Sequence, residues 1–209
     1  MPRSRTSRML DRIHRIPGKT LDVATYHAVR RAETERLTGP IWKLERSQYF
    51  HEPDDDPSWQ AFVADDWPRV HAVFESERAD ARAEVESYAR QGSELRRLRI
   101  VERPVSRYLL WEMQWFKILA EEGTAIRVLD AGDIETLERD GVLPEVVVDE
   151  HALYHVRYDE EWRPCGARRI DDPDVMRQAT TELAELWELA EPFSRYFTRE
   201  IMTLLPSAP

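Results

Sequence analysis

Residues 95–130 read LRRLRIVERPVSRYLLWEMQWFKILAEEGTAIRVLD, and this stretch decides the fold. Residues 95–101 alternate basic and apolar side chains as a strand does, and residues 125–129 form a second short strand. Between the two lies a segment of helical length that ends at Gly123. A strand, a crossover helix and a second strand in this order predict a parallel βαβ unit.

The segments around this unit extend the prediction to a complete fold. Further strands are expected at residues 145–149, 151–158 and 166–170, and the last two read as an antiparallel hairpin. Residues 41–46 form either a short strand or an extended docking segment. We therefore expect an α/β fold, with a small mixed sheet that holds a βαβ unit and a C-terminal β-hairpin, wrapped by N- and C-terminal helices.

The chain divides into three regions by charge and pattern. Residues 1–20 hold six basic residues and one acidic residue and are expected to form a flexible arm. Residues 21–92 are helical, with one helix expected from residue 66 to residue 90, and residues 93–205 form the α/β core with the C-terminal helices. We expect 21–92 and 93–205 to pack as a single compact unit. Because the whole chain carries a net charge of −10, a nucleic-acid partner is expected only through the basic arm.

The cysteine count and the lengths of the apolar runs indicate where in the cell the protein is located. Cys165 is the one cysteine in the 209 residues, so an internal disulfide cannot form. No apolar run approaches the roughly 18–20 residues that span a bilayer, and the first 18 residues lack the apolar core of a secretory signal. We therefore expect a cytoplasmic protein without a membrane partner.

The helix between the two strands of the βαβ unit is apolar on nearly every side. Only Glu112, Gln114 and Lys117 interrupt its apolar residues between 108 and 119. Such a helix is buried on several sides, here between the sheet and the N-terminal helices or between subunits. Because one sheet cannot cover all of its apolar surface, we expect self-association as a homodimer.

Arginines in the strands are the main indication of a binding site. Arg97 and Arg99 share one face of the first strand, and semi-buried guanidinium groups need a carboxylate or an anionic ligand. We expect Arg99 and Arg127 on the same face of neighbouring strands, within reach of Glu112 or Tyr108. A structural ion-pair network or simple solvent exposure is the alternative. The candidate ligand-binding residues are Arg97, Arg99, Glu102, Tyr108, Glu112, Arg127 and Asp149.

The carboxyl ends of the predicted strands are a second candidate functional site. Acidic residues and His151 occur in the segments 102–104, 130–133 and 149–151, and ligands gather at such ends in open α/β sheets. They could serve as a general acid–base set or a weak Mg²⁺ site, although Asp130 and Asp133 also suit helix caps. We expect neither a metal nor a cofactor, because His151 and His155 are four residues apart in a strand and no phosphate-binding or nucleophile motif occurs.

The order and spacing of several short motifs resemble an uncharacterised actinobacterial family of domains of unknown function. The resemblance implies a gene neighbourhood of helix-turn-helix regulators and their small partner proteins. It covers roughly residues 42–197 and is carried by Leu44-Glu45, Tyr49, Phe62, the run 97–104, Tyr108, Glu112, Gly123, Arg127, Asp149, Tyr158, Gly166, Asp172-Pro173 and 187–190.

The C-terminal half also resembles a degenerate phospholipase-D-like half domain. Active members of that family need His-x-Lys, whereas this chain has His155-Val156-Arg157. The resemblance implies a pocket that binds without phosphodiester chemistry. We therefore expect a non-catalytic regulatory or accessory protein that binds an anionic or polar small molecule or a protein partner. An enzyme of specialised metabolism that uses an Arg/Glu/Tyr pocket at the sheet rim is the alternative.

Overall fold

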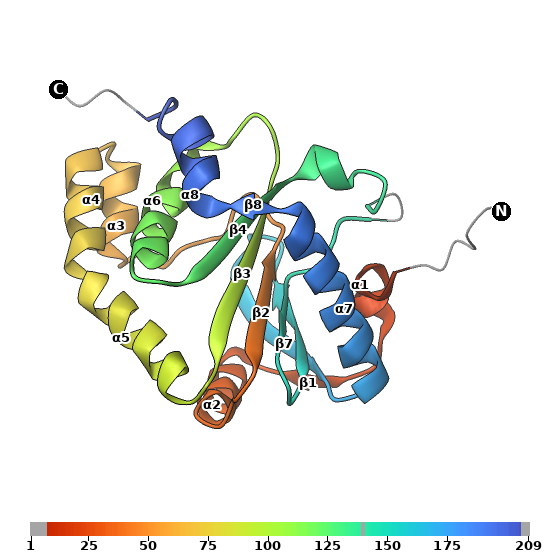
Figure 1. Cartoon of the computed structure of the whole chain (residues 1–209). Coiled ribbons are helices and arrows are strands. Elements are labelled where there is room, and N and C mark those ends of the chain that lie inside the picture. Colours follow the sequence, from red (N-terminus) through yellow and green to blue (C-terminus); the bar gives the residue numbers. More distant parts are fainter. Residues whose placement is uncertain (1–7, 139–140, 206–209) are drawn as a thin grey trace.

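A single mixed sheet forms the centre of the molecule in the computed structural model, which describes residues 8–138 and 141–205 (Figure 1). Its strand order is β1-β7-β6-β5-β2-β3-β4-β8. The strands are β1 (Lys19–Leu21), β2 (Pro40–Glu45), β3 (Glu94–Val101), β4 (Ala125–Asp130), β5 (Val146–Val148), β6 (Leu153–Tyr158), β7 (Pro164–Ile170) and β8 (Glu191–Pro192). The expected α/β fold with a mixed sheet is confirmed.

The predicted βαβ unit forms the parallel part of this sheet. Strands β3 and β4 are parallel and are joined by α6 (Arg107–Glu121), whose N-cap Ser106 accepts a hydrogen bond from the Leu109 N–H. Strand β2 also runs parallel to β3, so residues 41–46 supply a central strand. Strand β5 pairs with β2 in the antiparallel direction and leads into the β6–β7 hairpin.

Polar caps set the starts of most of the longer helices. Asp22, Asp56, Asp66 and Asp172 each accept a backbone N–H of the first turn, which supplies a partner that the helix itself lacks. No helix of residues 8–138 and 141–205 is long and apolar enough to cross a membrane. The helices are α1 (Met9–Arg12), α2 (Val23–Thr34), α3 (Pro57–Val63), α4 (Trp67–Ser76), α5 (Arg78–Arg90), α6, α7 (Pro173–Leu189) and α8 (Phe193–Tyr196).

The single helix expected from residue 66 to residue 90 is wrong, because the chain turns at Glu77 and forms α4 and α5. Figure 1 shows α5 leaving α4 at an angle and running toward the start of β3. The turn allows Phe74 of α4 and Ala81 of α5 to pack in the same apolar cluster as α6. A straight helix would carry its second half away from that cluster.

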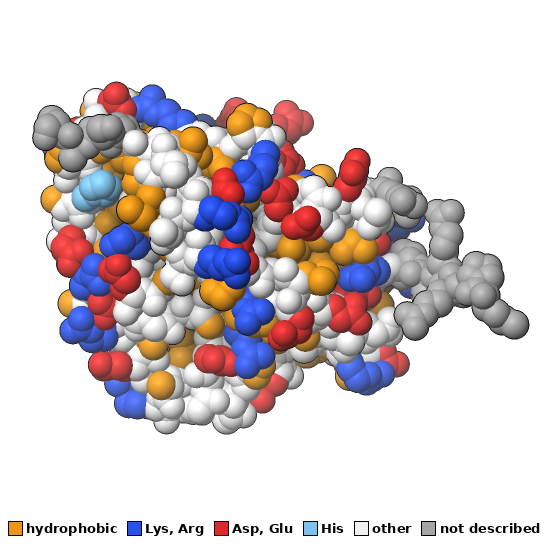
Figure 2. Space-filling view, turned by 45° about the horizontal axis from the view of Figure 1, so that its top comes forward, with side chains coloured by type: hydrophobic (Ala, Val, Ile, Leu, Met, Phe, Trp, Pro, Cys, Tyr) orange, Lys and Arg blue, Asp and Glu red, His pale blue; other side chains and the backbone are white. Residues whose placement is uncertain are grey.

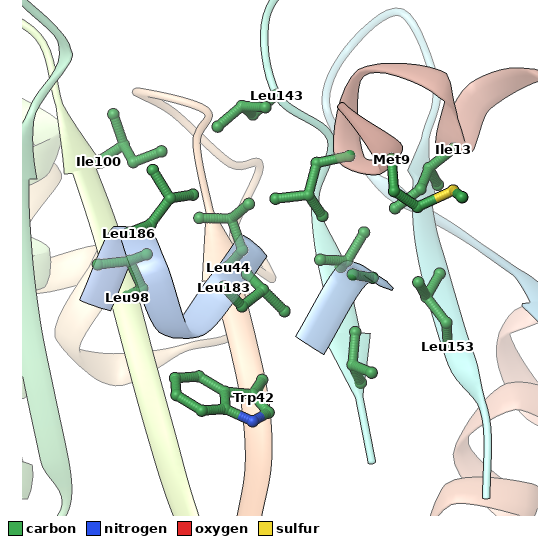
Figure 3. Close-up of a cluster of buried hydrophobic side chains, with 14 of the residues drawn as sticks. Met9, Ile13, Trp42, Leu44, Leu98, Ile100, Leu143, Leu153, Leu183 and Leu186 are labelled. Atoms are coloured by element: carbon green, nitrogen blue, oxygen red, sulfur yellow. The ribbon is translucent and has the colours of Figure 1, made fainter. Parts of the chain in front are cut away.

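One face of the sheet is covered by α7 and α1. Alternate residues of β2 and β3 point to this face, among them Leu44 and Leu98, and they pack against Leu183 and Leu186 of α7 (Figure 3). This cluster is apolar throughout, as expected for a sheet face that is buried under an amphipathic helix.

The other face carries two separate apolar clusters. Helix α6 covers β3 and β4, and α3, α4 and α5 pack on the outer side of α6. Helix α2 covers the part of the sheet around Tyr154 and Ala167, where Tyr26 and Val29 contact it. The strip of sheet between these two clusters holds the charged residues described below.

Residues 8–20 do not form the expected flexible arm. Met9, Leu10 and Ile13 are buried against α7, and the Glu182 carboxylate accepts the N–H groups of Met9 (2.7 Å) and Leu10 (2.9 Å). Strand β1 then pairs with β7. Met9, Leu10 and Ile13 are spaced one and three residues apart among the arginines. Their apolar side chains therefore form a short stripe, and this stripe packs the segment against α7. The part of the predicted arm at residues 1–7 lies outside the described residues.

Helix α6 lies between the sheet and the N-terminal helices, which was the first of its two expected positions. Tyr108, Trp111 and Phe116 are all buried within the one chain. The apolar surface that suggested self-association is therefore covered by α3, α4 and α5. The homodimer itself stays a prediction.

Surface charges lie close to charges of the opposite sign. Figure 2 shows basic and acidic side chains interspersed over the face that it displays. Arg78 Nη1 lies 2.7 Å from Glu122, and Arg199 Nη2 lies 2.6 Å from Glu191. An exposed arginine in this protein is therefore not by itself a sign of an anion-binding site.

Gly166 should be the least replaceable glycine among the described residues. Its φ of +112° disfavours side chains, and a Cβ atom here would lie 2.0 Å from the Leu21 carbonyl oxygen in β1. Because β1 is a three-residue edge strand that can shift, we expect Gly166→Ala to lower the free energy of unfolding by about 2 kcal/mol. Urea denaturation measures this loss. Gly39→Ala is the control, since nothing lies within 4 Å of that Cβ position; equal stability of the two variants would contradict the close approach.

Candidate functional site

Charged side chains occupy the strip between the two apolar clusters on the α6 face. Lys43 and Glu45 of β2 point to this face, as do Arg97 and Arg99 of β3, because alternate strand residues share a face. Above them is a cavity of about 430 Å³ between the sheet, α6 and the loop that precedes α3. Its walls include the aromatic side chains of Phe50, Phe74, Tyr108, Trp111, Trp115, Phe116 and Tyr158.

Glu45 lies at the centre of an ion-pair network on the floor of the cavity. Lys43 Nζ lies 2.7 Å from its Oε1, and Arg97 Nε lies 3.3 Å from its Oε2. The second contact lacks hydrogen-bond geometry, so Oε2 accepts no hydrogen bond. Burial raises the pKa of Glu45, but the charges of Arg97, Lys43 and Arg99 outweigh it and lower the pKa to about 2. Glu45 is therefore a carboxylate at any physiological pH.

Arg99 is completely buried behind this network. Its Nε donates to Glu112 Oε2 at 2.8 Å, and its Nη1 donates to the carbonyl oxygens of Glu45 and Ile100. The expected contact between the strand arginine and the polar strip of the crossover helix is confirmed. Burial raises the pKa of Glu112, and the charge of Arg99 opposes that rise.

Helix α6 also brings a tyrosine and a tryptophan to the cavity. The Tyr108 hydroxyl donates to Glu52 Oε1 at 2.5 Å. Burial raises the pKa of Glu52 against the effect of this hydrogen bond, and nearby Glu112 and Asp56 raise it further. Trp111 is 6% exposed, and its indole Nε1 has no hydrogen-bond partner among the described residues.

Glu145 lies next to the network, at the start of β5. Its Oε1 accepts the backbone N–H groups of Arg46 (2.8 Å) and Ser47 (2.6 Å). Burial raises its pKa to about 7, with the charge of Arg99 and these two hydrogen bonds acting against burial. The pKa of Glu145 is thus close to neutral pH.

The structure brings four of the seven candidate residues together. Arg97, Tyr108 and Glu112 line the cavity, and Arg99 lies directly behind Glu112. The expectation that Arg127 shares a face with Arg99 is wrong. Parallel pairing places Arg127 opposite Leu98 instead, and its Nη1 donates to the Trp187 carbonyl oxygen (2.7 Å) on the α7 face.

Glu102 and Asp149 also lie away from the cavity. Glu102 contacts Arg46 Nη1 at 2.7 Å near the carboxyl end of β3. Asp149 pairs with Arg30 and accepts the N–H groups of His151 and Ala152. Because β5 runs antiparallel to β2, its carboxyl end lies at the opposite edge of the sheet. The predicted convergence of Asp149 and His151 with the ends of β3 and β4 is therefore wrong.

Several cavity residues were not among the sequence candidates. Lys43 and Glu45 alternate with apolar residues in β2, which is the same signal that identified Arg97 and Arg99. Trp111 and Trp115 recur on the face of α6 that also holds Tyr108 and Glu112, at helical spacing. Glu52 comes from an irregular loop, where no periodicity predicts which side chain points inward.

The histidines of the β6 region form no metal site. Within the part of the chain that the structure describes, no group of three His, Cys, Asp or Glu residues could hold a metal ion. His155 lies beside Arg168 on the face opposite the cavity. Burial and then the charge of Arg168 lower its pKa to about 4, so His155 is neutral at physiological pH.

Comparison with known proteins places the chain in a family without an assigned function. Residues 30–198 match the domain of unknown function DUF6879, and the chain belongs to this family. No curated protein matches the sequence. The matched residues include every side chain that lines the cavity.

Proposed function

We propose that this DUF6879 domain binds a small polar molecule in the cavity between α6, β2 and β3, and that it does so without catalysis. One observation carries the proposal. Trp111 Nε1 is buried in a residue that lines the cavity and makes no hydrogen bond; Arg97 Nε and Glu45 Oε2, which face each other as an ion pair at 3.3 Å, make none either. Buried polar atoms are nearly always satisfied, so a bound molecule with an acceptor for Trp111 Nε1 would complete the atom that has no partner of any kind.

The size and lining of the cavity support the same proposal. Its volume of about 430 Å³ falls within the roughly 300–1,000 Å³ of sites for small molecules. Such sites combine apolar and aromatic walls with a few fixed polar groups. Here Trp111 and Trp115 supply wall surface, and Lys43, Glu45 and Arg97 hold one another in place. The floor is therefore pre-organised before a ligand arrives.

The test is capture of the ligand with a variant that removes one donor. The full chain is purified, and native mass spectrometry detects small molecules that accompany it. We expect Trp111→Phe to keep the aromatic wall but to lower occupancy about tenfold, because the bound acceptor loses its partner. Trp67→Phe is the control, since Trp67 donates to Asp65 outside the cavity. Equal occupancy in both variants would place any ligand elsewhere.

An enzyme is the second candidate, and one observation favours it. In the same cavity the pKa of Glu45 is lowered to about 2, whereas burial raises the pKa of Glu52 and Glu112. Carboxyl groups with separated pKa values can share the roles of acid and base. Incubation of the captured molecule with fresh protein distinguishes the two candidates. An unchanged mass supports binding, and conversion to a product supports the enzyme.

We further propose a regulatory or accessory role in the cytoplasm for the ligand-bound protein. The resemblance to proteins encoded beside helix-turn-helix regulators and the single cysteine support this role. The genes that flank family members test it, since regulators and biosynthetic genes point to different roles. The resemblance to phospholipase-D-like domains, in which the His-x-Lys lysine is replaced by Arg157, supports binding without phosphodiester hydrolysis.

A further inference from the structure

We infer that the ligand of this cavity is a monocarboxylate, a molecule with one negatively charged acid group on an apolar or aromatic body. The inference rests on the proposed function and adds the charge and the chemical class of the ligand to it. Buried donors without an acceptor, a surplus of positive charge on the cavity floor and a group of carboxyl side chains elsewhere in the lining support it.

The buried donors at the cavity lack acceptors. Trp111 is 6% exposed, and its Nε1 has no hydrogen-bond partner among the described residues. Arg97 Nε and Arg99 Nη2 are also buried and donate to no described residue. Trp111 and Arg97 line the cavity, and Arg99 lies directly behind Glu112. Because Trp and Arg side chains donate hydrogen bonds and never accept them, a ligand that completes this site presents acceptor atoms, as a carboxylate does.

The floor of the cavity holds more positive than negative charge. Lys43 and Arg97 both lie against Glu45, at 2.7 Å and 3.3 Å, and Arg99 donates to Glu112 at 2.8 Å. Three cationic groups thus share two carboxyl groups, and no further carboxylate of the described residues forms an ion pair with them. Lys43 and Arg97 line the cavity, so this surplus faces the ligand. One anionic group placed beside them would balance it with charge-assisted hydrogen bonds.

A second negative charge on the ligand would be repelled by another part of the lining. Glu52 and Asp56 from the loop before α3 and Glu77 at the end of α4 form an acidic wall of the cavity. Burial raises the pKa of both Glu52 and Glu77, and nearby Asp56 raises both further, so this wall already disfavours negative charge. The inferred ligand therefore carries one acid group, unlike a dicarboxylate or a phosphate monoester.

The aromatic side chains of the lining suit an apolar body on this acid. Phe74, Trp111, Trp115 and Phe116 all line the cavity. Aromatic rings bury much apolar surface of a bound molecule and pack against its own rings. The Arg97 Cζ atom lies 4.6 Å from the centroid of Phe116, so the same rings also hold a guanidinium group of the floor in place. Acid and apolar parts of the ligand would thus meet neighbouring parts of one cavity.

Three probes of related shape and different charge test the inference on the full chain. They are 3-phenylpropionate with one negative charge, benzylmalonate with two and 3-phenylpropionamide with none, each titrated by calorimetry at pH 6.5 and low salt. At this pH Glu145, whose pKa is about 7, is largely protonated and adds little charge beside the floor. We expect 3-phenylpropionate to bind about tenfold more tightly than either of the other probes, because its single charge meets the floor without a second one near the acidic wall.

Two variants remove positive charge from the floor. Arg97→Met should weaken 3-phenylpropionate by about tenfold and affect the uncharged amide much less, since the lost interaction is mainly that of a charged pair. Lys43→Met should have the same effect, and its side chain is 34% exposed, so the fold tolerates this change more easily. Arg96→Met is the matched control, because it removes the same charge from the adjacent position on the opposite face, beside Trp42. It should leave binding unchanged.

Thermal melting shows which variants are folded. Equal or tighter binding of the amide or of benzylmalonate overturns the monocarboxylate and leaves the proposed function in place. Unchanged binding of 3-phenylpropionate by folded Arg97→Met and Lys43→Met overturns it as well. Binding by none of the three probes overturns both the monocarboxylate and the proposed function.

Discussion

Arg99→Met is expected to lower the free energy of unfolding by about 3–5 kcal/mol, because it leaves a buried carboxylate without its cation. Arg99 has no exposed surface, and Glu112 is 7% exposed. The substitution also removes the donor of the carbonyl oxygen at Glu45. Methionine has a similar length and flexibility, so loss of volume is a minor part of the expected change. Urea denaturation at pH 7.5 measures it.

Two further variants separate the ion pair from simple packing. Arg99→Met combined with Glu112→Leu should recover most of the lost stability, since an apolar pair of similar volume often replaces a buried ion pair without cost. Arg96→Met, which removes an ion pair with exposed Glu94 two residues away in β3, should cost less than about 1 kcal/mol. A double variant as unstable as Arg99→Met alone would show that Arg99 acts through its other hydrogen bonds.

Stability should fall as the pH rises through neutrality, because Glu145 keeps its proton in the folded state. Its pKa is raised from 4.5 to about 7. Below about pH 4.5 both states hold the proton, whereas between these values only the folded state does. The free energy of unfolding then declines with pH, by about 3 kcal/mol in total for this group. The decline from Glu145 levels off as the pH rises above this folded-state pKa of about 7.

Glu145→Gln isolates this effect from the other titrating groups. The glutamine carbonyl oxygen can still accept the N–H groups of Arg46 and Ser47 but cannot ionise. We expect the variant to gain stability relative to the natural protein between pH 5 and pH 8, measured as the difference in urea midpoints at each pH. A difference that stays constant over this range would show that Glu145 is ionised throughout.

The parts of the fold that local patterns determine could be predicted from the sequence. Strand alternation and the length of residues 107–121 identified the βαβ unit, and Asp172-Pro173 identified the start of α7. The direction of the strands was harder to predict, because no local sequence pattern indicates that β5 pairs antiparallel with β2. That direction moves Asp149 to the opposite edge of the sheet. Long-range pairing of this kind depends on the whole chain.

In the candidate site, too, some contacts could be predicted from local sequence patterns and others could not. The Arg99–Glu112 pair was predictable because a crossover helix must lie over the strand that precedes it. The face of the sheet to which Arg127 points could not be predicted in the same way. A shift of one residue in the pairing of β3 and β4 moves every side chain of a strand to the other face. Glu52 and Phe50 reach the cavity from a loop, whose path depends on Tyr108 and Tyr158 rather than on its own sequence.

The burial of Met9, Leu10 and Ile13 has a consequence for where the domain begins. The match to the family starts at residue 30, whereas Met9 is already part of the packed core. The packed unit of this chain is thus longer than the segment that matches the family. A relative that lacks such an N-terminal segment must shield the same apolar strip beside α7 in another way, with a different stretch of its own chain or with a neighbouring molecule.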